Sequence, residues 1–407
     1  MNKVTIVSPD YYKQFHCITE KCTFNCCNGS WHIDIDKQTY EKYANNEMTT
    51  PYLAYIKTNP DAVNDRKFAF VLIEKNKSCP FLNAEGLCQI QKRWGVAHLS
   101  KVCRNYPRNA KLLAGIREKS LLLSCPEVLR LALFRDQQIS FVTQEYSDHI
   151  KATVANDQSS ETYILRVKQL ILDVLQEQGY SLDIKLYVVG YILQDFQALD
   201  QDEQDKTEMV LNCDYKMLLQ QYAEPMGQKK ANGWQEAWTL QVVAEIANFS
   251  FKTSDWKEFQ ELGAQAMAGL GLRGFRSREE INEQVIDKFT DAVRVLVLPF
   301  IASHPYWLEN YLVGYIFTYF HGDKTALFTQ YVRLVLVYEV TLFILTGLAA
   351  FRRECNEEMI SVAIANIIRN LVQGKAILDI KINQIERKSQ LNIGYVGKLI
   401  FGKDMPY

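Results

Sequence analysis

Apolar residues recur every three or four positions through most of the second half of the chain. Segments such as TYILRVKQLILDVLQEQG (162–179) and EEMISVAIANIIRNLVQ (357–373) show this spacing, which is typical of helices with one buried face. No repeat of fixed period and no low-complexity tract occurs in the sequence. The pattern predicts an all-helical domain over residues 161–407.

The longest apolar run extends from Leu334 to Phe351 and approaches the ~18 to 20 residues that span a bilayer. Glu339 lies in its middle, and arginines flank it on both sides. A carboxylate at the centre of a membrane costs about 2.5 to 3.5 kcal/mol. We therefore predict a buried core helix and no membrane span.

The first 135 residues carry shorter patterns. Trp31 to Asp36 alternates between apolar and polar residues, which predicts a short strand, and Asp36 can cap a helix that follows. The pattern further predicts a strand at 68–73, hairpins at 79–90 and 111–125, a helix at 94–101 and a helix that begins at Pro126. These elements indicate a small α+β module.

Polar residues dominate from 136 to 160, and we interpret this segment as a connection. The predicted organisation is therefore a mainly α protein, with an α+β module at 1–135, a connection at 136–160 and a helical domain at 161–407.

Charge and composition exclude one class of partner and favour one compartment. Lys and Arg number 46 and Asp and Glu 47, so no net basic charge favours nucleic acid. The first residues contain no apolar run of signal-peptide length. We expect a cytoplasmic protein, in which clustered thiols bind metal more often than they form disulfides.

Eight of the ten cysteines lie within the first 125 residues. Four thiolates can hold a tetrahedral zinc or an iron-sulfur cluster, and eight can supply more than one site. Because Cys26 and Cys27 are adjacent, their binding the same metal atom is geometrically awkward, and one of them packs or serves a second site. The candidate metal ligands are Cys17, Cys22, Cys26, Cys27, Cys79, Cys88, Cys103 and Cys125.

Cys125 stands at the predicted start of a helix, where we expect the helix dipole to lower the pKa of its thiol. Alternatively, an outlying cysteine is not a ligand but a small apolar residue that is buried in the core. No C-x-x-C knuckle typical of structural zinc occurs, and Cys22-x3-Cys26 continues directly into Cys27. The spacing of radical S-adenosylmethionine enzymes is thus absent, while zinc and iron both remain open.

The segment CRNYPRNA places Arg104 and Arg108 on either side of Tyr106. The two guanidinium groups can bind a carboxylate of a cofactor, although a solvated basic turn is an equal alternative. Trp31 can stack on an adenine ring or pack in the small core. His16 and His32 flank the cysteines without metal-ligand spacing.

These motifs together resemble the flagellin lysine N-methylases, which belong to a wider group of cysteine-rich, zinc- or iron-chelating proteins. The matching pieces occur in the order SPDYYKQFHCITEKCTFNCCNGSWHIDID, CPFLNAEGLCQIQ, CRNYPR and LSCPE, followed by HPYWLENYLVGYIF. The wider group tends to have shorter gaps between its cysteines. The resemblance implies a cytoplasmic enzyme that transfers methyl groups from S-adenosylmethionine to lysines of flagellin, and a cluster of the four-iron four-sulfur type.

For the substrate pocket we expect the seam between module and helical domain, where Tyr106 can face Glu309, Asn310 and Tyr311. Glu309, Tyr311 or Tyr106 can then orient or deprotonate the lysine amine, although Glu309 can equally be a cap or an ion-pair partner. A cluster can hold the loops, anchor S-adenosylmethionine or start a radical reaction, and we favour a cluster close to the methyl donor. The rivals are a structural-zinc adaptor and an iron-sulfur protein for electron transfer.

Overall fold

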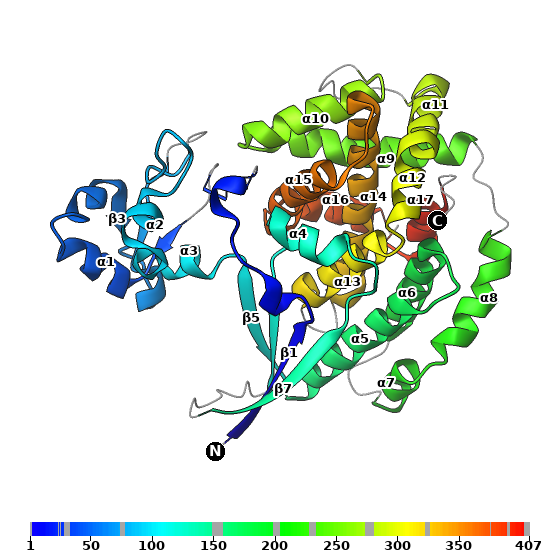
Figure 1. Ribbon diagram of the computed structural model, residues 1–407. Coiled ribbons are helices and arrows are strands. Elements are labelled where there is room, and N and C mark those ends of the chain that lie inside the picture. The colour runs from blue at the N-terminus through cyan, green and yellow to red at the C-terminus, as the bar shows by residue number, and fades with distance from the viewer. Residues whose placement is uncertain are drawn as a thin grey trace.

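The computed structural model describes residues 2–402, apart from 23, 25, 28–32, 74–77, 149–157, 198–203, 228–232, 273–280, 322–325, 375 and 389–390. The start of the predicted strand at Trp31 and His32 lies outside the described residues. The architecture is mainly helical, with two small sheets in the N-terminal part (Figure 1).

The all-helical character predicted for the C-terminal part is confirmed, and its helices pack around α14 (Leu327–Arg352). This helix is long and apolar enough to cross a membrane, yet 89% of its most apolar 18-residue stretch is buried inside the protein. The prediction of a buried core helix is confirmed. The other helices are α5 (Gln158–Gln176), α6 (Leu182–Gln197), α7 (Gln204–Leu211), α8 (Tyr215–Gly227), α9 (Gly233–Thr253), α10 (Lys257–Gly269), α11 (Glu283–Ala292), α12 (Leu298–Ser303), α13 (Trp307–Tyr319), α15 (Glu357–Ile367), α16 (Ala376–Arg387) and α17 (Ile393–Phe401).

In the described part of the bundle, two π-helical segments interrupt the α-helices. One, Val293–Val297, joins α11 to α12, and the other, η8 (Ile368–Gln373), continues α15. Single π-turns inside α-helices frequently occur at functional sites. The second segment carries Arg369, which lies next to the cysteines described below.

A four-stranded sheet of order β5-β6-β1-β7 packs against α5 and α13. Its strands are β1 (Asn2–Pro9), β5 (Arg108–Leu113), β6 (Ile116–Leu121) and β7 (Phe141–Asp148). The predicted hairpin at 111–125 is β5–β6, and both of its turn residues, Ala114 and Gly115, have positive φ, as tight hairpin turns require. Strand β7 lies inside the predicted connection and pairs with the whole length of β1.

A separate lobe, residues 33–105, contains a three-stranded sheet of order β2-β4-β3. Its strands are β2 (Asp34–Ile35), β3 (Ile56–Thr58) and β4 (Ala69–Val71), and its helices are α1 (Lys37–Ala44), α2 (Gln89–Trp94) and α3 (Lys101–Asn105). The lobe lies beside the rest of the protein, which we call the body (Figure 1). The lobe has its own core, whereas the core around Leu121, Leu123 and Leu129 is continuous with the bundle.

Local signals explain which short elements were predicted correctly. Asp36 caps α1 by accepting a hydrogen bond from the N–H of Thr39 at 3.2 Å, and α4 (Pro126–Leu133) begins at Pro126. The helix predicted at 94–101 is wrong, because Gly95 at positive φ ends α2 and Ser100 caps a new helix, α3. The hairpin predicted at 79–90 is reduced to one bridge between Leu82 and Cys88.

Candidate functional site

Four of the candidate cysteines gather at the core of the lobe. Cys79 is part of that core, and Cys27, Cys88 and Cys103 pack against it half-buried. The N–H of Cys79 donates to the carbonyl of Cys27 at 2.9 Å, so these two distant segments are joined directly. We call Cys27, Cys79, Cys88 and Cys103 the lobe thiols.

The other four candidate cysteines lie outside the core of the lobe. Cys125 is part of the core of the body, and Cys22 packs against it. The charge of Cys26 acts on both of these thiols, and Cys17 acts on Cys22. We call Cys17, Cys22, Cys26 and Cys125 the seam thiols.

Several of the sulfurs accept hydrogen bonds from the backbone a few residues ahead. The N–H groups of Glu127 and Val128 donate to Cys125, as the start of α4 allows. Cys79 accepts from Phe81, and Cys88 accepts from Ile90 and Gln91. Such bonds favour the thiolate, which is the form that binds metals.

Burial nevertheless decides the pKa of most of these thiols. Desolvation raises the pKa of Cys79 and of Cys125 to about 12 and that of Cys103 to about 11. The predicted lowering at Cys125 is therefore wrong, because burial outweighs the backbone hydrogen bonds at the helix start.

Cys26 differs from the other thiols. A hydrogen bond from Cys27 lowers the pKa of Cys26 to about 7, against the opposing effect of burial, and the charge of Arg369 acts in the same direction. The pKa of Cys27 is raised by the same bond. The adjacent pair thus shares one proton, and different roles of the two residues in metal binding stay a prediction.

The thiols are suitable metal ligands chemically, but the distances between them do not suit a single metal ion. Eight sulfurs and their backbone donors make a ligand set suited to thiophilic metals. Among the described residues, however, no three His, Cys, Asp or Glu side chains converge closely enough to hold a single metal ion. No disulfide joins any of the cysteines.

Arg369, on η8, is the site residue that sequence reasoning missed. Its guanidinium lies between two aromatic rings, 4.0 Å from the centroid of Phe24 and 4.4 Å from that of Trp256. The side chain is buried, its guanidinium is hydrogen-bonded to Tyr106, and the thiolate of Cys26 favours its charged form. A helical pattern gives no signal for such a position, because the stacking partners come from other segments.

We expected Tyr106 to face Glu309, Asn310 and Tyr311, but the partners found for it in the helical domain are Arg369 and, through Ser124, Gln373. Its hydroxyl donates to the carbonyl of Ser124 at 2.9 Å and is hydrogen-bonded to Arg369. The amide of Gln373 donates to the hydroxyl of Ser124 at 3.1 Å. Burial raises the pKa of Tyr106, so the hydroxyl stays protonated and acts as a donor.

The predicted cofactor-binding arginines lie at the surface. Arg104 is exposed. Arg108 is exposed too, and it donates to the carbonyl of Phe15 at 3.1 Å and stacks on the ring of Phe15 at 5.0 Å. Trp31 lies outside the described residues.

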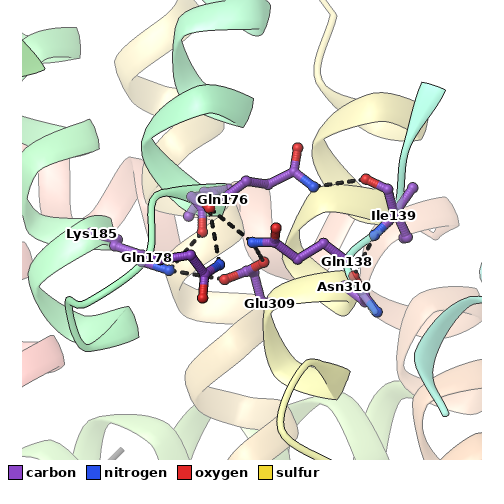
Figure 2. A network of polar contacts seen from close by, with 8 residues as sticks. Gln138, Ile139, Gln176, Gln178, Lys185, Glu309 and Asn310 are labelled. Carbon is purple, nitrogen blue, oxygen red and sulfur yellow. Dashed lines mark hydrogen bonds and ion pairs between the residues drawn. The ribbon is translucent and has the colours of Figure 1, made fainter. Parts of the chain in front are cut away.

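Glu309 and its neighbours hold the segment after α4 against the bundle. Figure 2 shows the carboxylate of Glu309 between Lys185 and Gln138, at 2.9 Å and 2.5 Å respectively. Asn310 accepts from the N–H of Ile139 at 2.9 Å. Tyr311 is buried and shares a hydrogen bond of 3.2 Å with Thr341. These contacts are those of a structural joint, and a catalytic role of Glu309 or Tyr311 stays a prediction.

Comparison with known proteins agrees with the resemblance seen in the motifs. A lysine-N-methylase of Salmonella typhimurium is 31% identical over 134 residues, which cover 31% of this chain and 32% of that protein. The flagellar biosynthetic protein FliU of Salmonella muenchen is 32% identical over 134 residues, or 31% of this chain and 76% of FliU. The match thus spans about a third of the length of the Salmonella typhimurium lysine-N-methylase.

No solved structure matches the chain. The family model described as the FliB lysine N-methylase C-terminal domain matches residues 168–397, which is more than half of the chain. This region begins in α5 and ends in α17, and it includes α14 and η8 with Arg369. The chain belongs to the FliB lysine N-methylase family.

Proposed function

We propose that this protein transfers methyl groups from S-adenosylmethionine to lysine side chains of flagellin. The observation that carries the proposal is the family match over residues 168–397. The names of two relatives, a lysine-N-methylase and a flagellar biosynthetic protein, support the choice of substrate. We place the reaction in the cytoplasm, a reducing compartment in which ten cysteines without a disulfide are stable.

We further propose an iron-sulfur cluster on the cysteines, close to the methyl donor. The backbone donors to Cys79, Cys88 and Cys125 support thiolate ligands. Bound there, a cluster supplies either a Lewis-acidic iron or an electron.

Residues of the chain itself can meet one further need of methyl transfer, the alignment of the methyl donor. A neutral lysine amine is a nucleophile, so the reaction requires deprotonation and alignment with the methyl group. The seam around Tyr106 and Arg369 offers a protonated hydroxyl and a guanidinium held between two rings. A guanidinium is suited to orienting a carboxylate such as that of S-adenosylmethionine.

The test is incubation of the purified chain with methyl-labelled S-adenosylmethionine and flagellin, with and without a reductant. Label on flagellin lysines, located by mass spectrometry, supports the proposal. The control is flagellin whose lysines have been chemically blocked. Absence of label on lysine under both conditions would remove the methylase proposal and favour the adaptor or electron-transfer alternative.

A further inference from the structure

We propose that the body carries a second binding site, away from the seam, that takes up the methylated ammonium group of a lysine side chain. Its walls are the rings of Tyr187 and Tyr191 on α6 and of Tyr222 on α8, and the carboxylate of Asp195 lies at its edge. The inference rests on the proposed function, because methyl transfer to lysine produces this ligand. It adds a place where the product is bound outside the site of reaction.

The three tyrosine rings meet at steep angles. The centroid of the Tyr222 ring lies 5.2 Å from that of Tyr187 at an interplanar angle of 73°, and 5.6 Å from that of Tyr191 at 54°. All three side chains are half-buried, so part of each is in contact with solvent. Rings that meet at such angles present themselves to one small cation from two directions, which a parallel stack does not do.

Packing of the core does not account for this arrangement. Tyr222 packs against the core of the body, but Tyr187 and Tyr191 are not among the partly buried side chains that do so. Gly397 on α17 leaves room for the ring of Tyr187, since a Cβ atom there would lie 3.0 Å from the Cε2 atom of Tyr187. The ring of Phe401, at the end of α17, lies 5.5 Å from that of Tyr187. The tyrosines of α6 therefore lie at the surface of the bundle, next to α8.

Asp195 supplies the negative charge of the site. It follows Tyr187 and Tyr191 at intervals of four residues on α6, which places all three on one side of the helix. The side chain is exposed, and the only effect on its pKa is that of partial burial, which raises it. No cation or hydrogen-bond donor among the described residues therefore neutralises this carboxylate. Its charge acts on the hydroxyl of Tyr222 across the contact between the two helices, so the carboxylate lies near the rings.

A methylated ammonium matches these groups better than an unmodified one. Methyl groups enlarge the ammonium, spread its charge and replace N–H donors that bind water, so exchanging water for aromatic rings costs less free energy. A mono- or dimethylated lysine still keeps an N–H that can donate to the carboxylate of Asp195. We therefore expect the site to prefer methylated over unmodified lysine.

The site is remote from the seam. Figure 1 shows α8 on the side of the body away from the lobe, whereas Arg369 of the seam stacks on Phe24 in the N-terminal part. Both α6 and α8 belong to the region that the family model matches. A protein substrate with several lysines can thus be held at this site by one methylated lysine while another lysine reacts at the seam.

The experiment measures the binding of two small probes to the full chain in the absence of S-adenosylmethionine. The probes are N-acetyl-Nε,Nε-dimethyllysine amide and its unmethylated counterpart, and NMR titrations that observe the probes give the dissociation constants. We expect the dimethylated probe to bind about threefold more tightly or better. Tyr222→Ala should remove this preference, and Tyr222→Phe should keep it because the ring remains. Equal binding of the two probes to the unmodified chain would overturn the proposal.

Asp195→Lys is the variant that guards against misfolding, because Asp195 is exposed and the change places a like charge beside the probe. It should remove the preference and leave the circular dichroism spectrum unchanged. Tyr55→Ala, which removes a tyrosine of the lobe that is 47% exposed, is the matched control and should leave both dissociation constants unchanged.

The outcomes separate this inference from the proposed function. A preference that survives in a folded Tyr222→Ala or Asp195→Lys variant would belong to another part of the protein and would overturn the site. A preference located at these residues in a chain without methyl transfer would overturn the proposed function alone. An active enzyme that lacks the preference would overturn only this inference.

Discussion

The carboxylate of Glu309 on α13 lies 2.9 Å from the ammonium of Lys185 on α6, and both side chains are at most one-tenth exposed. The second carboxylate oxygen accepts from Gln138, and Lys185 also donates to the carbonyl of Leu175. The pair thus fastens α6, α13 and the segment after α4 to one another. Because both oxygens of Glu309 have partners in these contacts, we expect its carboxylate to stabilise the fold and not to take part in catalysis.

Glu309→Gln should therefore lower the free energy of unfolding by about 3 to 5 kcal/mol, because it leaves Lys185 buried without a counter-charge. Urea denaturation followed by circular dichroism measures the loss. The double variant Lys185→Met/Glu309→Leu should lose less, since it removes both charges. If Glu309→Gln unfolds like the unmodified chain and yet has no methyl transfer, Glu309 acts in catalysis and the structural interpretation is wrong.

Gly347→Ala should disturb the close packing of α14 against α10. A Cβ atom at this position of α14 would lie 2.3 Å from the backbone oxygen of Ala266 on α10, which cannot move aside alone. We expect a loss of about 1 to 3 kcal/mol in the free energy of unfolding. Gly314→Ala on α13 is the matched control, because its Cβ would meet only the two methyl groups of Leu123, at 3.5 and 3.6 Å. That change should be neutral or stabilising by up to about 1 kcal/mol, and equal losses in both variants would contradict the argument.

The bidentate ion pair between Arg135 and Asp10, which we call the fork, predicts that the protein loses part of its stability in acid. Two hydrogen bonds of 2.5 and 2.7 Å join them. Burial opposes ionisation of Asp10, but the bonds from Arg135 and Ser140 prevail and hold its pKa below the ordinary value of 3.8. A carboxyl group whose pKa is lowered by folding stabilises the folded state at pH values above its ordinary pKa. This contribution is lost as the pH falls through the pKa of the folded state.

Asp10→Asn should accordingly lower the free energy of unfolding by about 1 to 3 kcal/mol at neutral pH. The difference from the unmodified chain should shrink as the pH falls below 3.8, because Asp10 is then protonated in the unmodified chain as well. Urea titrations at several pH values measure this convergence. A difference that stays constant down to pH ~2, well below the ordinary range of a carboxyl group, would show that the fork contributes by packing only.

Features that depend on neighbouring residues could be predicted from the sequence. The cap at Asp36, the start of α4 at Pro126 and the burial of α14 all follow from residues within one or two turns. Strand β7 could not be recognised, because its polar sequence FVTQEYSD forms a strand only by pairing with β1 at the other end of the N-terminal part. Pairing between distant segments leaves no local pattern.

The candidate site shows the same limit. Its cysteines were identifiable by type and clustering, but their division between two cores depends on tertiary packing. Arg369 was hidden in an apolar helix, since its role comes from Phe24 and Trp256. The ion-pair alternative for Glu309 was visible in the sequence, whereas its partner Lys185 was not.

Cys26 should be more acidic than Cys79, Cys103 and Cys125 in the metal-free chain. Its pKa of about 7 means that it is mostly thiolate at pH ~8, whereas Cys79 and Cys125, with pKa values of about 12, are not. Iodoacetamide should therefore alkylate Cys26 before Cys79 and Cys125, with a rate that reaches half its maximum near pH 7. Cys27→Ala and Arg369→Gln should both move that midpoint upward, since each removes a group that favours the thiolate. Mass spectrometry of peptides quenched at successive pH values measures the rates, and a midpoint near the ordinary 9.0 in the unmodified chain would refute the shared proton.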